Sequence, residues 1–148
     1  MVLAAVLLCG GKGSRMLDGG ITTHKPLLEV GGMPATRFVV ERLLNSNLKF
    51  SQILIVVPPG REEEYENALE GLNCHIITQN HALGTGNAVY NSLDYLSEKV
   101  EHVYVSFGTQ PLVRNETVEG VLEIHLQKKL SFSLATVITV SYTHLRAH

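Results

Sequence analysis

Leu8-Cys9-Gly10-Gly11-Lys12-Gly13-Ser14-Arg15-Met16 is the stretch that decides the fold, because it follows directly on an apolar run, residues 2–8. Three glycines after a buried strand allow a tight turn and bring backbone N–H groups toward an anion. Lys12, Arg15 and, a little further on, Lys25 add the positive charge that a triphosphate needs. The stretch therefore predicts a strand that ends in a phosphate-binding loop.

Two better-known glycine loops do not fit this stretch. A Walker loop needs Gly-Lys-Ser/Thr after four intervening residues, but here Lys12 precedes Gly13 and Ser14 follows it. The dinucleotide fingerprint needs a small residue where Met16 stands, and an acidic residue at the end of a second strand. The alternative that stays open is an ordinary glycine-rich turn between a strand and a helix.

The composition is that of one globular domain. The chain has 148 residues, of which 45% are hydrophobic, which is enough to bury a core. A net charge of -2 provides no basic field for nucleic acid. The apolar start lacks the cationic segment and the small-residue cleavage site of a signal peptide, so we interpret it as the first strand and expect no membrane partner.

The cysteines and histidines do not form a metal-binding pattern. Cys9 and Cys74 have no metal-ligand spacing and are typical of buried thiols in a reducing compartment, which predicts a cytoplasmic location. The seven histidines are scattered, and only His144 and His148 share an i, i+4 spacing. We therefore expect no zinc site.

Short apolar runs alternate with amphipathic stretches, which is typical of βαβ units and a parallel sheet. The fold class predicted is α/β, a Rossmann-like three-layer αβα arrangement with a mostly parallel sheet. Strands are expected at 2–8, 52–57, 74–78, 102–106 and 132–140. Helices are expected from Pro34, over the acidic run 62–64, from 88 to 96, and at Glu116 with Asn115 as its N-cap.

A second glycine-containing stretch, residues 79–87, reads Gln-Asn-His-Ala-Leu-Gly-Thr-Gly-Asn and follows the third expected strand. Gly84 and Gly86 allow close backbone approach, Thr85 offers a hydroxyl and a helix cap, and the Gln79 amide can donate to and accept from a nucleobase. Loops that follow parallel strands meet at one edge of the sheet. We expect this stretch to lie beside residues 8–16; read alone, it could be only a glycine-rich helix start.

These blocks resemble the N-terminal part of the nucleotidyltransferases that make nucleoside-diphosphate sugars, most closely the N-acetylglucosamine-1-phosphate uridylyltransferase type. Residues 8–16 match its Leu-Ala-Ala-Gly-x-Gly-Thr-Arg-Met, Lys25-Pro26 matches its signature lysine, and Gln79 with residues 83–89 matches its Gln and Leu-Gly-Thr-Gly-x-Ala. The similarity covers residues 1 to about 139. It implies a nucleotidyltransferase, glycosyltransferase-A-like fold that is truncated at its C-terminal end, with residues 1–140 as the nucleotide-binding part.

The resemblance also implies a role for individual residues. Lys12 and Arg15 would face the departing β- and γ-phosphates, and Lys25 would face the α-phosphate, which makes Arg15 and Lys25 the expected catalytic residues. The expected nucleotide-binding residues, those nearest the base and ribose first, are Leu8, Cys9, Gly10, Gly11, Gln79, Gly84 and Thr85, then Lys12, Gly13, Ser14 and Gly108.

The chain departs from the family pattern after its fourth expected strand. The family reads Gly-Asp-x-Pro-Leu, with an aspartate that binds Mg²⁺, whereas residues 107–112 read Phe-Gly-Thr-Gln-Pro-Leu. Mg²⁺ is the cofactor that the resemblance implies, and Thr109 stands at its position without a charge. In the family, a sugar-binding half and a second metal ligand follow the position that corresponds to residue 139, and we expect them to lie beyond the residues given. Residues 141–148 match no family element, and we interpret them as a non-native or disordered tail of a truncated reading frame.

The function expected is transfer of a nucleotidyl group from a nucleoside triphosphate, UTP first, to a sugar-1-phosphate or similar phosphate acceptor, with release of pyrophosphate. One alternative is a nucleotide-binding module without turnover, because Thr109 replaces the metal carboxylate. Another is a cytidylyltransferase acting on a polyol or sugar-acid phosphate. That branch shares the first loop and usually lacks the Leu-Gly-Thr-Gly block.

Overall fold

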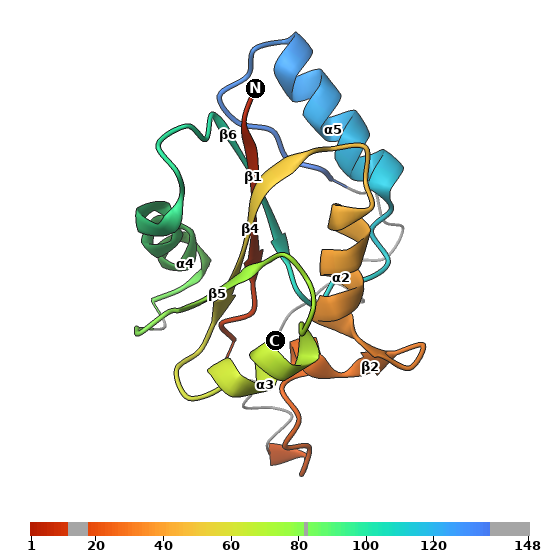
Figure 1. Cartoon of the computed structure of the whole chain (residues 1–148), viewed down its shortest axis with the longest axis vertical. Helices are drawn as coiled ribbons and strands as arrows, with labels where there is room; N and C mark the ends of the chain where they lie inside the picture. The colour runs from red at the N-terminus through yellow and green to blue at the C-terminus, as the bar shows by residue number, and fades with distance from the viewer. Residues whose placement is uncertain (12–17, 82, 137–148) are drawn as a thin grey trace. The chain divides into compact units, whose positions relative to one another are not determined.

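The computed structural model describes residues 1–11, 18–81 and 83–136, and the chain divides into two compact units, Met1–Asn115 and Glu116–His148. The first unit contains a parallel four-stranded sheet whose strand order is β5-β4-β1-β6 (Figure 1). The strands are β1 (Leu3–Leu8), β4 (Phe50–Val57), β5 (His75–Thr78) and β6 (His102–Phe107).

The inner strand β1 corresponds to the apolar run at the start of the sequence. All six residues of β1 are buried, since the strand has a neighbour on each side and is covered on both faces. At its carboxyl end Leu8 pairs with Val56 of β4 and with Phe107 of β6, so three strands end at one level. The first four expected strands are confirmed to within two residues at each end.

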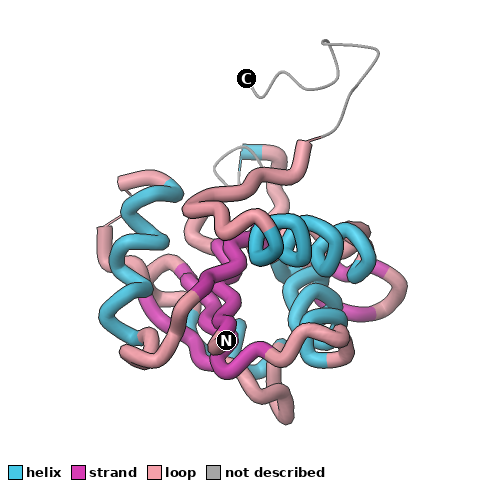
Figure 2. The backbone as a smooth tube through the Cα atoms, turned by 90° about the horizontal axis from the view of Figure 1, so that it is seen from above, coloured by secondary structure: helices cyan, strands magenta, loops and turns pink. Residues whose placement is uncertain are grey.

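Helices cover both faces of this sheet. On one face, the core contains residues of α2 (Ala35–Leu44) and Tyr65 of α3 (Glu62–Ala68). On the other face, α4 (Thr85–Ser92) contributes Ala88, and the short 3-10 helix η2 (Leu93–Tyr95) continues the chain. Viewed from above, helical segments lie on both sides of the strands (Figure 2). The three-layer αβα class is therefore confirmed.

A short hairpin between the first strand and α2 was not predicted. The 3-10 helix η1 (Lys25–Leu27) leads into β2 (Glu29–Val30) and β3 (Met33–Pro34), which pair antiparallel. The two turn residues, Gly31 and Gly32, have φ of 63° and 83°, the conformation of a type I′ turn. The Gly-Gly pair was the available signal, and Pro34 ends β3 just before α2 begins.

Two expectations near the end of the described residues are wrong. Residues 132–136, which include the apolar Phe132 and Leu134, form no strand, and no strand among the described residues pairs with them; residues 137–140 lie outside the described residues. The helix α5 (Asn115–Gln127) begins at Asn115 itself, whose Nδ2 donates to the Arg42 carbonyl at 3.3 Å and whose Oδ1 has no hydrogen-bond partner. Asn115 therefore does not cap the helix.

Within Glu116–His148, the His125 side chain is hydrogen-bonded to the segment that follows α5: its Nδ1 lies 2.9 Å from the Ser133 hydroxyl. No helix in the described part of the chain combines the length and the apolar character that crossing a bilayer requires.

Candidate functional site

A cavity of about 490 Å³ opens at the carboxyl ends of the strands, where ligands of open α/β sheets bind. It brings together the loop after β1, the start of η1, the loop after β5, and the end of β6. Its lining residues are Leu8, Cys9, Gly10, Gly11, His24, Lys25, Pro26, Gln79, Gly84, Thr85, Ala88, Phe107 and Thr109.

Most of the residues predicted for the site lie at this cavity. The two stretches that were expected to meet do so, and Lys25 and Thr109 join them. Gly108 is buried and does not line the cavity. The predicted residues Lys12, Gly13, Ser14 and Arg15 lie outside the described residues. His24, Pro26, Ala88 and Phe107 were not predicted for the site. Pro26 and Ala88 lie within the stretches that carry the family resemblance, whereas no pattern in the local sequence marks His24 or Phe107.

Gln79 is fixed in one orientation at the floor of the cavity. Its side chain is only 5% exposed, and Nε2 donates to the Gly84 carbonyl at 3.3 Å and to Asn87 Oδ1 at 3.1 Å. Because a carbonyl oxygen only accepts, this contact decides which end of the amide is nitrogen. A Cβ on Gly10 would lie 2.7 Å from Gln79 Oε1, so the oxygen faces Gly10. The expectation that Gln79 both donates and accepts is corrected, since only the acceptor Oε1 remains for a ligand.

The start of α4 borders the same cavity. The N-cap residue is Gly84, which has no side chain, and Thr85 is the first helical residue, so the expected cap at Thr85 is wrong. The first intrahelical bond runs from Ala88 N to the Gly84 carbonyl at 3.2 Å. The N–H groups before Ala88 therefore have no acceptor within the helix, which makes this end of α4 a hydrogen-bond donor.

Lys25 is exposed at the cavity but stands between two buried neighbours, His24 and Pro26. The Pro26 carbonyl accepts a hydrogen bond of 2.8 Å from Thr36 Oγ1 in α2. Since the residues on both sides of Lys25 are held in the protein interior, the place from which its side chain enters the cavity is fixed.

Cys9 is part of the packing beneath the cavity. Its thiol lies 3.8 Å from Thr36 Oγ1, which is also 3.4 Å from the Gly108 carbonyl. Burial raises the pKa of the Cys9 thiol to about 11, so that the thiol is protonated near neutral pH. Cys9 is therefore a small packing residue and not a nucleophile.

The residues at the cavity do not fit a carboxylate-based magnesium site. No Asp or Glu lines it, and residues 12–17, 82 and 137–148, which the structure does not describe, contain neither residue type. Among the described residues, no three His, Cys, Asp or Glu side chains gather as a metal site. Thr109 offers only a neutral hydroxyl, whereas Mg²⁺ on phosphates is usually bound through one or two carboxylates.

A glycine loop after the first strand, a fixed amide opposite it and a lysine at the rim define an α/β domain of the nucleotide-binding type. The chain belongs to the family of MobA-like NTP transferase domains, whose family model matches residues 5–141.

Known proteins similar to this chain agree with that family. The chain is 36% identical over 124 residues to the bifunctional protein GlmU of Francisella tularensis subsp. novicida; this alignment covers 83% of the chain and 25% of GlmU. The chain thus spans about a quarter of the length of the curated relatives it matches.

Two solved structures share the fold. One is 4-diphosphocytidyl-2C-methyl-D-erythritol synthase from Anaerococcus prevotii, with a TM-score of 0.67, 18% identity, and coverage of 86% of this chain and 52% of the other. The second is Rv0371C from Mycobacterium tuberculosis in complex with manganese, with a TM-score of 0.66, 13% identity, and coverage of 84% and 59%.

Proposed function

We propose that the chain is the nucleotide-binding part of a nucleotidyltransferase that transfers a uridylyl group from UTP to a sugar-1-phosphate or similar phosphate acceptor and releases pyrophosphate. The family and the 36% identity to GlmU support nucleotidyl transfer. The choice of UTP rests on the hydrogen-bonding character of the cavity.

The observation that carries this choice is the fixed orientation of Gln79. Its Oε1 can only accept, and the uracil edge offers one donor, N3–H, between two carbonyl acceptors. The open N–H groups at the start of α4 supply donors for such a carbonyl. Cytosine in the same position carries a lone pair at N3 in place of the hydrogen and would set two acceptors against each other. It could donate to Oε1 only through its 4-amino group, from a shifted position of the ring. We therefore infer uracil as the base.

The phosphates are assigned to the basic residues. Lys25 stands at the rim of the cavity, and Lys12 and Arg15 follow Gly11 in the sequence. An oxygen of the acceptor phosphate attacks the α-phosphorus of UTP, the bond to the bridging oxygen breaks, and pyrophosphate leaves with that electron pair. The protein aligns the two phosphates and offsets their charge, and it needs no nucleophile of its own.

Arg15→Ala tests whether the basic residues bind phosphate. Because a nucleoside has no group for charge-assisted hydrogen bonding to Arg15, the variant should lose much more affinity for UTP than for uridine. Calorimetric titration of both ligands measures the difference, and Arg114→Ala, which removes an exposed arginine away from the cavity, is the control. Equal losses for UTP and uridine would contradict the assignment.

A nucleotide-binding module without turnover is the second candidate, favoured by the absence of a carboxylate among the cavity-lining residues. Whether or not the chain is catalytic, Mg²⁺ should change its UTP affinity little, because no carboxylate lines the cavity. Thr109→Asp adds a carboxylate at the cavity and should make UTP binding depend on Mg²⁺. UTP titrations with and without Mg²⁺ on both proteins test this. A strong Mg²⁺ effect that is already present with Thr109 and unchanged in the variant would show that the metal is held elsewhere.

We place the protein in the cytoplasm, as both cysteines are free thiols and nucleoside triphosphates are made and used there.

A further inference from the structure

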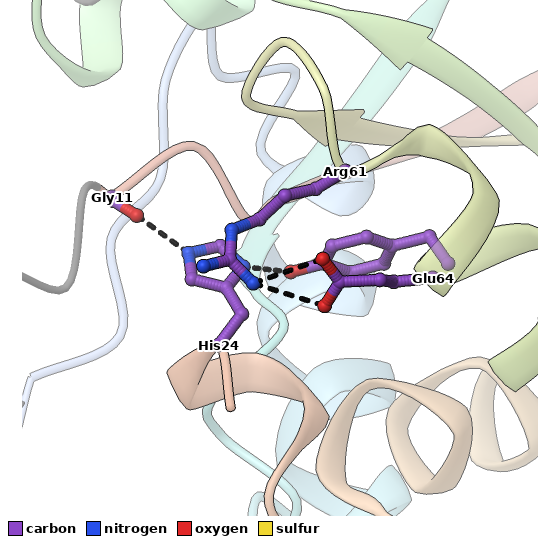
Figure 3. A network of polar contacts seen from close by, with 5 residues as sticks. Gly11, His24, Arg61 and Glu64 are labelled. Atoms are coloured by element: carbon purple, nitrogen blue, oxygen red, sulfur yellow. Dashed lines mark hydrogen bonds and ion pairs between the residues drawn. The ribbon is translucent and has the colours of Figure 1, made fainter. Parts of the chain in front are cut away.

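His24 joins two parts of the protein that are far apart in the sequence. Its ring is 4% exposed, Nε2 lies 2.5 Å from the Gly11 carbonyl, and Nδ1 lies 2.7 Å from the Tyr65 hydroxyl of α3. Figure 3 shows the ring between the Gly11 carbonyl and the aromatic side chain beside Glu64. The contact to Gly11 reaches the last described residue before Lys12, and His24 itself precedes Lys25.

The two partners determine where the protons are. The Gly11 carbonyl only accepts, so Nε2 carries a hydrogen and donates it. Tyr65 is fully buried, and burial, followed by the neighbouring Cys9, raises the pKa of its hydroxyl above the ordinary range. The phenol is therefore protonated and donates to Nδ1 of a neutral ring. An imidazolium would turn Nδ1 into a donor, and the Tyr65 hydrogen would have to move to a weak acceptor such as the Cys9 sulfur.

We propose that His24 is a positioning residue for phosphate binding: as a neutral Nε2–H tautomer held by Tyr65, it fixes the Gly11 peptide at the start of the phosphate loop and the backbone before Lys25. The idea rests on the proposed function, because it assigns triphosphate binding to Lys12, Arg15 and Lys25. His24 itself contacts no phosphate. It acts through the backbone, at Gly11 before Lys12 and at its own position before Lys25.

The charged groups around His24 are consistent with a neutral ring. Burial, the largest cause, and the nearby Arg61 lower the pKa of His24, while the contact to the Gly11 carbonyl and the Glu64 carboxylate raise it; the net direction is downward. Arg61 is itself paired with Glu64 at 2.9 Å, so the two charges largely offset each other next to the ring.

The pH dependence of stability follows from this direction. A histidine whose pKa is lower in the folded than in the unfolded protein binds fewer protons when folded. Its contribution to the free energy of unfolding is complete above the unfolded value of about 6.5 and is lost as the pH falls through the folded-state pKa. As the pH falls below 6.5, the free energy of unfolding, measured with urea, should therefore decrease more for wild type than for a His24→Gln variant.

Two substitutions separate positioning from packing. His24→Gln keeps an N–H donor at about the reach of Nε2, whereas His24→Leu fills the space without a donor. UTP affinity should fall roughly five- to tenfold in the Leu variant and stay within about twofold of wild type in the Gln variant, while uridine affinity changes less. His75→Leu, at an exposed histidine away from the cavity, is the control.

Tyr65→Phe completes the test through a double-mutant cycle. If Tyr65 acts only by holding His24, the hydroxyl should matter for UTP affinity in wild type and not in His24→Leu, so the two losses are not additive. Additive losses, or a Leu variant that binds UTP as well as the Gln variant, would overturn the proposal and leave His24 as a packing residue.

Nuclear magnetic resonance gives a readout that needs no nucleotide. The ring nitrogen shifts of His24 should show the proton on Nε2, and the carbonyl carbon of Gly11 should shift in His24→Leu but not in His24→Gln. A proton on Nδ1, or an unchanged Gly11 carbonyl, would overturn the positioning role. If the ring and carbonyl behave as expected but wild type does not bind UTP, the proposed nucleotide specificity fails and the His24 linkage stands.

Discussion

Gly108→Ala should lower the free energy of unfolding by about 1–3 kcal/mol, the usual cost of forcing extra volume into a packed core. A Cβ at this position would overlap the Cys9 sulfur and lie 2.8 Å from Thr36 Oγ1, and both side chains are buried. Thr36 cannot move without breaking its contacts with the Pro26 and Gly108 carbonyls, and Cys9 cannot move without losing its contact with Thr36. Urea unfolding of wild type and variant measures the difference.

Gly120→Ala is the matched control for that substitution. It makes the same change within α5, where an added Cβ would have no heavy atom within 4 Å. Alanine is the better helix former by up to about 1 kcal/mol, so this variant should be as stable as wild type or more so. If Gly108→Ala behaved in the same way, the close packing of Cys9, Thr36 and Gly108 described above would be incorrect.

Gln79→Ala should weaken UTP binding by about tenfold to a hundredfold. A hydrogen bond to a buried, oriented amide is worth on the order of 1–3 kcal/mol, because its loss leaves the ligand group without a partner beside a residue that is itself only 5% exposed. The substitution also frees Gly84 and Asn87, which Gln79 holds through Nε2. Calorimetric titration measures the loss, and Gln127→Ala at the exposed end of α5 serves as the control. Equal affinity in wild type and Gln79→Ala would remove Gln79 from the base site.

The sequence was sufficient for the inner strands because β1 and the second half of β4 are continuous apolar runs that are buried on both faces. β1 and β4 were therefore located closely, and the order of loops along the chain placed residues 8–11 and 79–85 at one edge. The same reasoning failed at 132–136, since apolar side chains do not show whether a neighbouring strand is present. The capping expectations at Thr85 and Asn115 failed because a suitable side chain does not ensure that its oxygen faces the helix.

The details that give the cavity its chemistry could not be read from the sequence. His24 and Tyr65 are 41 residues apart and meet only through the fold. The orientation of Gln79 depends on Gly84 and Asn87, which follow it on the next loop and helix and become partners only once α4 forms. Both sets of contacts form only in the folded chain, and local residue patterns do not indicate them.

Titration of the wild-type chain with UTP, CTP and uridine tests directly whether the cavity binds a uridine nucleotide. Uridine lacks the phosphates that Lys12, Arg15 and Lys25 would bind, and CTP lacks the N3–H that the Gln79 oxygen would accept. We expect one saturable site that binds UTP more tightly than CTP and much more tightly than uridine. Absence of saturable binding with either triphosphate, or tighter binding of CTP than of UTP, would contradict it.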